Sequence, residues 1–248
     1  MKILIWGCGS MSSSWALGLQ ESGLEFICYN PTPSKAQELA QKLKGVVWSG
    51  QDFDAVVLGF KPQKLAEAED ELKKIIKPDT LVISLLAGVK MSRLKTAFNA
   101  PVIRLMPNLL IAKGSGVCLW SSTLSSDANA QWQQNFNRLG FAPYMSEKEI
   151  DLYTLHAGCS PAFLFFLIQE MKNIAQENGG DSTLAAQILV QSLKGTIQDL
   201  EGVEDFEAMM NKVASKGGVT EATLKSWKDS SAFAVGLRKG LQRISELS

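Results

Sequence analysis

Two glycines near the start of the chain have the spacing that binds a phosphate group. Gly7 and Gly9 follow an apolar run, residues 3–6, and directly precede Ser10 and Met11, where a helix can begin. A first glycine permits a tight turn, and a second allows the backbone to approach a pyrophosphate. The free N–H groups at the helix start then face the phosphate oxygens. This pattern predicts a strand, a turn and a helix that bind a dinucleotide.

The third position of this glycine motif carries Ser12, where Gly or Ala is usual. Serine is small enough for the helix to pack closely on the strand, so the prediction of a dinucleotide site still holds. A short Gly-x-Gly sequence also occurs in ordinary turns, and that alternative stays open.

The residues after the second predicted strand indicate which dinucleotide is bound. In NAD-specific sheets an acidic residue at this point binds the ribose hydroxyls. Asn30 stands there instead, so a 2′-phosphate is not repelled, and Thr32, Ser34 and Lys35 can form hydrogen bonds to it. We therefore predict NADP(H) as the cofactor, with NAD(H) as the alternative. The segment can also be an ordinary loop with a helix cap at Ser34.

A further polar residue lies where cofactors meet a parallel sheet. Asn108 follows Pro107 after a predicted strand at residues 102–106, at the carboxyl edge of the sheet. Dinucleotides bind along this edge, so we expect Asn108 to border the cofactor. The alternative is that Pro107 and Asn108 only end the strand.

The elements that position these residues alternate between strand and helix. Short apolar runs predict strands at residues 3–6, 24–30, 46–48, 54–60, 81–87 and 102–106, with two more near 117–120 and 141–144. Helices are predicted at residues 34–43, from Pro62 onward, and at 126–139. This alternation predicts a Rossmann-type, doubly wound, mostly parallel sheet over residues 1–150.

Strand-like runs disappear after Ser146, and helix-period segments replace them. They cover residues 161–178, 182–200, 206–214 and 220–247, with Asp181 as a cap for the second. We predict an all-helical domain over residues 151–248. The stripe of Phe163, Phe166 and Met171 has helical spacing and indicates a core or an interface.

Composition narrows the class of protein. The chain has 248 residues, 46% of them apolar, and a formal net charge of zero, which argues against nucleic acid or an anionic membrane as the main partner. Four scattered cysteines and a single histidine do not form a common metal site. The longest apolar run, residues 161–168, is too short to cross a bilayer, and Lys2 leads straight into a strand without a signal peptide. We predict a cytoplasmic enzyme without a metal.

Several short motifs occur in a fixed order along the chain. They are GCGSM (7–11), FKPQ (60–63), SLLAGV (84–89), RLMPN (104–108), GSGV (114–117), HAGCSPAF (156–163) and SKGGVT (215–220). Each motif is weak alone, but their order and spacing are specific. By these motifs the chain resembles the pyrroline-5-carboxylate reductase family over nearly its whole length and in register.

The sequence also departs from the family pattern. Leu109 and Leu110 stand where the family usually has Thr-Pro. The other departures are Pro31, Ala157, Cys159, Ser160 and Lys216. These positions leave the exact substrate and the catalytic rate open.

The resemblance implies NADPH-dependent reduction of 1-pyrroline-5-carboxylate to proline, by hydride transfer to the cyclic imine. A protonated imine is already electrophilic, so the protein mainly orients the reactants and stabilises charge. The substrate carboxylate needs donors, and the N–H groups around Gly217 and Gly218 with the Ser215 hydroxyl can supply them. By resemblance, Thr220 donates a hydrogen bond to the ring nitrogen and is the catalytic residue. The alternatives are a plain turn at the glycines and an N-cap at Thr220.

The resemblance also places Lys61, Pro62 and Ala87 at the cofactor, and gives Lys61 and Pro62 a backbone contact near the nicotinamide. A helix start with a solvated lysine is the alternative for Lys61 and Pro62. We expect a homodimer, or a larger homo-oligomer built on it. By resemblance, Gly218 and Thr220 of one subunit then complete the site of its mate.

Two other functions stay open from the sequence. One is a related imine or 2-oxo/hydroxy-acid reductase whose pocket differs at Leu109 and Leu110. The other is a non-catalytic NADP-binding regulatory protein. Oxidation of NADPH with pyrroline-5-carboxylate, compared with other imines and oxo acids, separates these functions.

Overall fold

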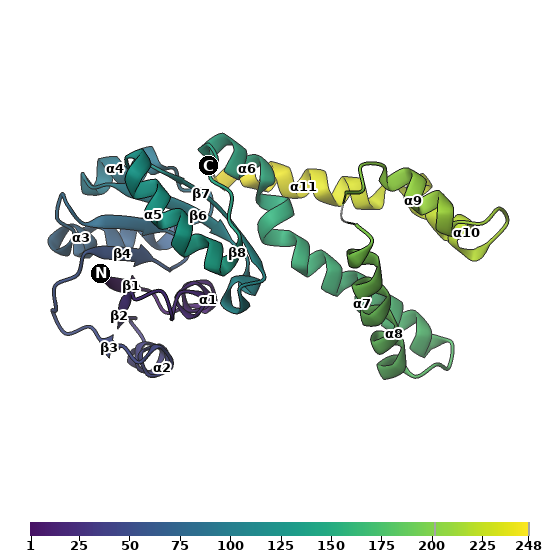
Figure 1. The fold of residues 1–248 in the computed structure, drawn as a ribbon, viewed down its shortest axis with the longest axis horizontal. Helices are drawn as coiled ribbons and strands as arrows, with labels where there is room; N and C mark the ends of the chain where they lie inside the picture. The colour runs from purple at the N-terminus through teal and green to yellow at the C-terminus, as the bar shows by residue number, and fades with distance from the viewer. Residues whose placement is uncertain (201, 248) are drawn as a thin grey trace. The chain divides into compact units, whose positions relative to one another are not determined.

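A single sheet of eight strands organises the N-terminal part of the chain (Figure 1). The computed structural model describes residues 1–200 and 202–247. The strand order is β3-β2-β1-β4-β5-β6-β7-β8, and every pair is parallel except β6 with β7, which confirms the mostly parallel doubly wound sheet. The strands are β1 (Lys2–Trp6), β2 (Glu25–Tyr29), β3 (Val46–Val47), β4 (Ala55–Leu58), β5 (Leu81–Ser84), β6 (Val102–Pro107), β7 (Gly116–Ser122) and β8 (Gly140–Phe141).

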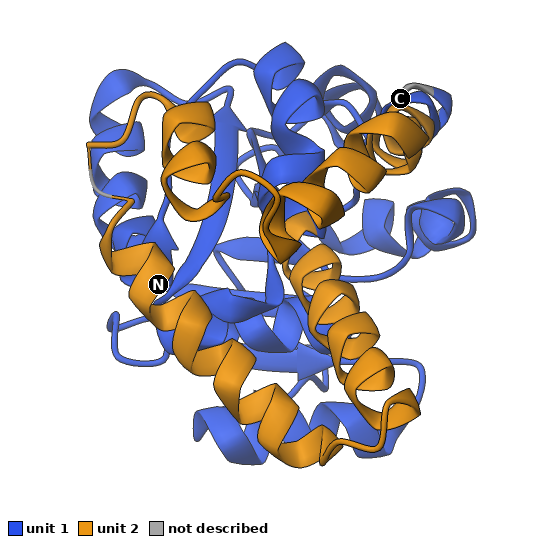
Figure 2. Cartoon of the chain, turned by 90° about the vertical axis from the view of Figure 1, so that its right-hand side faces the viewer, with its two compact units in different colours: residues 1–159, 241–248 blue, residues 160–240 orange. Residues whose placement is uncertain are grey.

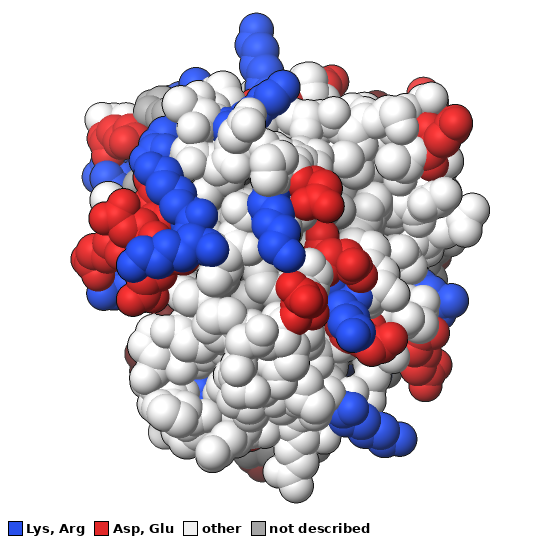
Figure 3. Space-filling view, turned by 90° about the vertical axis from the view of Figure 1, so that its left-hand side faces the viewer, with Lys and Arg blue, Asp and Glu red and all other residues white. Residues whose placement is uncertain are grey.

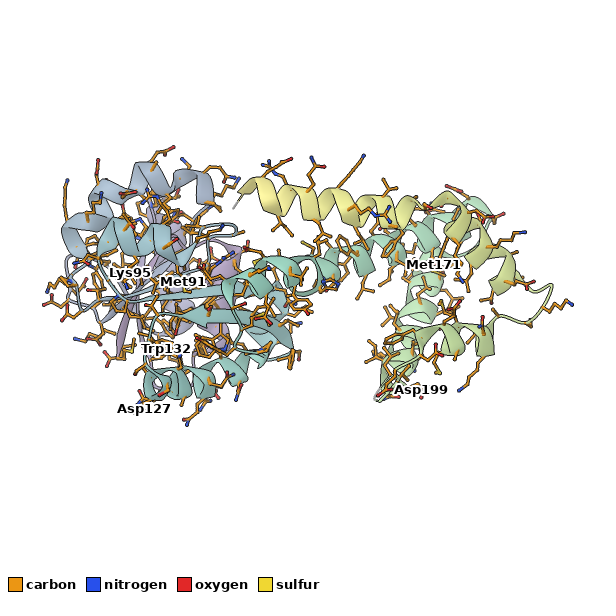
Figure 4. All side chains as sticks on the ribbon, turned by 90° about the horizontal axis from the view of Figure 1, so that it is seen from above. Met91, Lys95, Asp127, Trp132, Met171 and Asp199 are labelled. Carbon is orange, nitrogen blue, oxygen red and sulfur yellow. The ribbon has the colours of Figure 1, made fainter. Side chains whose placement is uncertain are left out.

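Helices cover both faces of the sheet. One apolar cluster joins the strands to α1 (Ser10–Gly18), α2 (Pro33–Leu43) and α5 (Ser126–Phe136). The other joins them to α3 (Leu65–Ile75) and α4 (Met91–Phe98). Trp132 of α5 and Met91 of α4, labelled in Figure 4, mark the two layers. Because both faces are covered, the inner strands are apolar throughout, which is why short apolar runs predicted them.

The helices differ from the expected boundaries in several places. Pro62 begins a 3-10 turn, η1 (Pro62–Lys64), and α3 follows it. Helix α4 was not predicted; it is a short helix that buries only Leu94 and Phe98, four residues apart. The helix expected at residues 220–247 is wrong as a single element. Ser231 adopts a left-handed φ of 52° and separates α10 (Val219–Ser230) from α11 (Ala232–Leu247).

The C-terminal part is helical, as predicted, and the chain forms two compact units (Figure 2). One unit is Met1–Cys159 with the chain end from Leu241, and the other is Ser160–Gly240. The N-terminal unit thus runs past residue 150 and includes α6 (Glu147–Thr154) and a π-helical turn, η4 (Leu155–Cys159). The division of function at residue 150 stays a prediction. The helical domain predicted to end at Ser248 reaches beyond the described residues. The remaining helices are α7 (Ser160–Glu177), α8 (Ser182–Gln198) and α9 (Phe206–Val213).

The helical unit has no interior of its own. Among the described residues of α7, α8, α9 and α10, no side chain is buried. Large apolar groups instead face outward, and Phe165 and Phe166 are 66% and 67% exposed. A surface of this kind in a folded unit indicates a further partner.

One stretch among the described residues is long and apolar enough to cross a membrane. It is the run Glu147–Glu177, made of α6, η4 and α7, with a mean hydropathy of 1.3 in its most apolar window. Only 22% of that window is buried. Length and composition are shared by membrane spans and by helices that pack in oligomers, so the predicted absence of a membrane partner stays a prediction.

Charges of both signs are mixed on the face of the molecule that Figure 3 shows. In α3, for example, Glu69 pairs with Lys73 of the same helix and with Arg93 of α4. These two cations hold the pKa of the Glu69 carboxyl below its usual value, with Lys73 the larger influence. The mixture agrees with the formal net charge of zero.

Candidate functional site

The turn after β1 leaves no space for a side chain at two positions. Gly7 has a φ of +103°, and its N–H donates to the carbonyl oxygen of Tyr29 at 2.8 Å. A Cβ on Gly7 would lie 2.9 Å from the carbonyl carbon of Gly59, and a Cβ on Gly59 would lie 2.5 Å from the Gly7 oxygen. Both residues must therefore be glycine. Gly59 follows β4 and belongs to none of the motifs in the sequence, so its role was missed.

Ser12 fills the third position of the glycine motif and closes the turn. Its side chain is fully buried, and its Oγ lies 2.5 Å from the carbonyl oxygen of Gly7 and 3.1 Å from that of Gly9. The hydroxyl donates to these carbonyls, which a glycine or an alanine could not bond. A Cβ on Gly59 would also lie 2.5 Å from the Ser12 Cβ, so helix and strand are in direct contact here.

The start of α1 can receive an anion. Gly9 is the N-cap, with extended backbone and no side chain over the first turn. Ser10 and Met11 open the helix, and the N–H groups of a first turn have no partner within the helix. The first turn consists of the residues SMSS, which carry no charge, so nothing there opposes the positive end of the helix dipole. These residues fit a dinucleotide phosphate.

Asn30 joins the glycine turn to the next loop. Its Oδ1 accepts the N–H of Cys8 at 3.0 Å, and its Nδ2 donates to the Thr32 oxygen at 3.1 Å. Thr32 is the N-cap of α2, so a cap at Ser34 is wrong, and the helix begins one residue earlier than expected. Ser34 and Lys35 are exposed in the first turn of α2. They are open to a 2′-phosphate, although their contact with one stays a prediction.

Lys61, Pro62 and Ala87 reach the same edge of the sheet as the glycine turn. Lys61 precedes η1 after β4, and Ala87 lies in a turn after β5. Since β1, β4 and β5 are neighbours and parallel, their carboxyl ends lie side by side. Lys61 is exposed and Ala87 half-buried. The backbone contact of Lys61 and Pro62 with a nicotinamide, and the contact of Ala87 with the cofactor, stay predictions.

The Asn108 side chain forms hydrogen bonds that hold neighbouring segments of the fold together. The residue is 3% exposed, and its Oδ1 accepts the N–H of Leu110 at 3.1 Å and that of Val117 at 3.4 Å. Its Nδ2 donates to the carbonyl oxygen of Ala157 at 2.9 Å, which ties β6 to the π-helical turn. The amide therefore positions neighbouring segments, and its predicted contact with the cofactor is untested.

A buried arginine, whose role was not predicted, holds α6 against the sheet. Arg104 in β6 contacts Glu147 Oε1 at 3.0 Å and Asp151 Oδ1 at 2.5 Å. Glu147 also accepts the backbone N–H of Met91 at 2.8 Å. These bonds explain why α6 belongs to the N-terminal unit. A charged residue inside an apolar strand was the available signal, since a buried arginine needs a carboxylate partner.

Residues 215–218 form a tight loop before α10, and Val219 and Thr220 open the helix. Gly217 has a φ of +73°, and its N–H donates to Glu221 Oε2 at 2.7 Å. The N–H of Gly218 donates to the Ser215 oxygen at 2.9 Å. The N-cap of α10 is Gly218, so Thr220 is not the cap but the second residue of the helix.

This loop therefore offers different donors from those expected. The N–H groups of Gly217 and Gly218 are already bonded within the chain, one of them to a carboxylate. The N–H groups of Val219 and Thr220, in the first turn of α10, have no partner within the helix. Glu221 was not predicted to take part, because only the folded loop brings its carboxylate to Gly217.

Two family models match separate parts of the chain. Residues 147–247 match the model for pyrroline-5-carboxylate reductase dimerisation, which together with the exposed apolar groups supports a homo-oligomer. Residues 2–88 match the model described as NADP oxidoreductase, coenzyme F420-dependent.

Relatives match over almost the whole chain. Pyrroline-5-carboxylate reductase 2 of Bacillus subtilis is 29% identical over 92% of this chain and 87% of its own. The pyrroline-5-carboxylate reductase of Pseudomonas aeruginosa is 28% identical over 100% and 97%. Among solved structures, the reductase of Streptococcus pyogenes has a TM-score of 0.89 at 25% identity, covering 100% of this chain and 98% of that one. The Plasmodium falciparum enzyme with NADP bound has a TM-score of 0.85 at 21% identity, covering 99% and 97%, and supports the fold.

A dinucleotide-binding sheet followed by a helical dimerisation region defines the class as an NAD(P)H-dependent oxidoreductase. Within that class, the chain is similar to pyrroline-5-carboxylate reductases along almost its whole length and carries a match to their dimerisation model, which confirms the resemblance found in the sequence.

Proposed function

We propose that this protein reduces 1-pyrroline-5-carboxylate to proline with NADPH. The observation that carries the proposal is the glycine turn, closed by Ser12 and Gly59, in a chain that matches reductases of this name along their length. The chemistry that NADPH supplies when bound is a hydride for the imine carbon. The chain itself has to hold the two reactants in line and to neutralise the substrate carboxylate.

The N-terminal unit is the side that holds the cofactor. The N–H groups of Ser10 and Met11 bind the pyrophosphate, and Gly9 lets it approach the backbone. Ser34 and Lys35, exposed at the start of α2, bind the 2′-phosphate. Asn30 supports both regions, because its side chain bonds to Cys8 and to Thr32.

The helical unit is the side that holds the imine. The N–H groups of Val219 and Thr220 at the start of α10, with the Ser215 hydroxyl, receive the carboxylate. The two glycines add no side chain of their own to this approach, where the Glu221 carboxylate accepts the Gly217 N–H. The Thr220 hydroxyl bonds to the ring nitrogen, with its oxygen accepting the N–H of the protonated imine, and so positions the imine for hydride transfer.

The working unit is a homodimer whose sites are shared. The match to a dimerisation model and the outward-facing Phe165 and Phe166 support this assembly. In it, the loop of Gly218 and Thr220 from one subunit completes the site at the glycine turn of the other. This also gives the apolar run of α7 a partner other than a membrane.

Steady-state oxidation of NADPH tests the proposal. Pyrroline-5-carboxylate is compared with pyrroline lacking the carboxylate, with other cyclic imines and with 2-oxo acids, each with NADPH and NADH. We expect the highest kcat/KM for pyrroline-5-carboxylate with NADPH. A clear preference for an oxo acid would contradict the proposal, as would binding of NADPH without turnover of any substrate.

A further inference from the structure

Two cysteines, Cys8 in the glycine turn and Cys28 in β2, lie close to each other, and neither has a role in the proposed mechanism. Cys8 is the residue between Gly7 and Gly9, and Cys28 lies in β2, where it pairs with Ile5 of β1. Both belong to the apolar cluster on the side of α1 and α2. The Cys8 Sγ lies 3.4 Å from the carbonyl oxygen of Tyr29, the neighbour of Cys28, and the two buried thiols are close enough to shift each other's pKa in opposite directions.

The environment makes the two thiols chemically different. The neighbouring Cys28 thiol lowers the pKa of the Cys8 thiol, although burial acts in the opposite direction. The Cys8 thiol and burial raise the pKa of the Cys28 thiol. Cys8 is 7% exposed, at the turn, and Cys28 is fully buried. Since the thiolate is the reactive form, Cys8 is the group that an oxidant meets first.

We propose that Cys8 and Cys28 form a disulfide in the presence of a peroxide, and that this disulfide closes the cofactor turn. The Cys8 thiolate attacks one peroxide oxygen, the O–O bond breaks, and a sulfenic acid and water form after proton uptake. The Cys28 sulfur then attacks the Cys8 sulfur and expels the hydroxyl as a second water, with the Cys28 proton. The two thiols are oxidised, and hydrogen peroxide is reduced to two waters.

The backbone of the glycine turn cannot easily change its conformation to accommodate a disulfide bond. A disulfide brings the sulfurs to about 2.05 Å, well inside the contact distance of two unbonded sulfur atoms. The backbone of Cys8 is held by Asn30 through its N–H, and Gly7 is packed against Gly59. Pulling Cys8 toward β2 therefore moves the backbone that faces the pyrophosphate. This consequence rests on the proposed binding of NADPH at the turn.

The experiment combines mass analysis with NADPH binding. The full-length protein is reduced, treated with hydrogen peroxide and desalted, and its peptides are mapped by mass spectrometry. We expect a Cys8–Cys28 cross-link with the loss of two hydrogens. The Kd for NADPH, from a fluorescence titration, should rise about tenfold or more, as the loss of a charge-assisted hydrogen bond implies. A reductant should restore it.

Two variants distinguish oxidation of the Cys8–Cys28 pair from oxidation of other residues. Cys28→Ala should keep its affinity for NADPH after peroxide, because Cys8 then has no partner. Cys118→Ala, which removes a fully buried thiol in β7, should respond as the wild type does. If thermal melting shows that Cys28→Ala does not fold, the cross-link and its reversal in the wild type decide the question.

The possible results distinguish failure of this inference from failure of the proposed function. Peroxide treatment that leaves Cys8 and Cys28 unlinked, or a cross-link that leaves the Kd unchanged, would overturn the inference alone. A reduced wild-type protein that does not bind NADPH would overturn the proposed function, and the regulation of binding with it.

Discussion

At the scale of single residues, Gly59 sets the shape of the cofactor turn from a neighbouring strand. A Cβ at this position would meet both the Gly7 oxygen and the Ser12 Cβ at 2.5 Å. We predict that Gly59→Ala raises the Kd for NADPH about tenfold or more, since strain of this size moves the backbone. The matched control is Gly195→Ala in α8, where an added Cβ meets nothing within 4 Å. Equal affinities in the two variants, measured by titration, would contradict the role of Gly59.

Glu221 is the second residue whose effect can be predicted. Its carboxylate accepts the N–H of Gly217, so a substrate carboxylate entering this loop meets a negative charge. We predict that Glu221→Gln lowers the KM for pyrroline-5-carboxylate several-fold and leaves the KM for pyrroline without a carboxylate unchanged. Initial-rate kinetics give both values.

The control for Glu221 is Glu207→Gln, an exposed carboxylate of α9 that lies 3.7 Å from Lys228. It removes the same charge away from the loop. An equal fall in KM for both variants would show a general charge effect. An increase in KM for Glu221→Gln would show that this carboxylate serves the site.

At the scale of elements, Arg104 is the connection between β6 and α6. Replacing it with Met leaves two carboxylates without their cation, one of them also bonded to Met91. Removing one partner of a buried ion pair costs about 3–5 kcal/mol, and we predict that loss for Arg104→Met in denaturant unfolding. Arg93→Met, which removes a half-exposed pair with Glu69, should cost about 1 kcal/mol or less. Similar losses for both would contradict a special role for Arg104.

Most of the sheet could be predicted from the sequence, because a strand covered on both faces is a short apolar run. The elements that escaped prediction are held by contacts distant in the sequence. Helix α4 buries only two side chains, and α6 depends on Arg104. The break at Ser231 rests on a single left-handed residue, which a helical pattern of apolar positions does not reveal.

The candidate site likewise contains residues that could be predicted from the sequence and residues that could not. Gly7, Gly9 and Ser12 could be found because their roles depend on neighbours in the sequence. Gly59 and Glu221 could not, since Gly59 meets a turn some fifty residues earlier in the chain and Glu221 folds back on its own loop. Sequence spacing predicts which backbone approaches a ligand, but it does not show which N–H groups are already bonded.

At the scale of the whole molecule, the exposed helical unit requires a partner. We predict a homodimer in sedimentation at working concentrations. Mixing Gly9→Asp, which blocks the cofactor turn, with Thr220→Ala should recover activity once subunits exchange, because some shared sites then carry neither change. The control is each variant mixed with itself. A monomer, or no recovery after proven exchange, would contradict shared sites.

The transfer of a hydride to the imine carbon tests the central claim most directly. Pyrroline-5-carboxylate is incubated with the protein and NADPH deuterated at the transferring position of the nicotinamide, and the product is analysed by mass spectrometry. We predict proline that carries a single deuterium at C5, the former imine carbon. Absence of proline, or proline without deuterium, would contradict the proposed reaction.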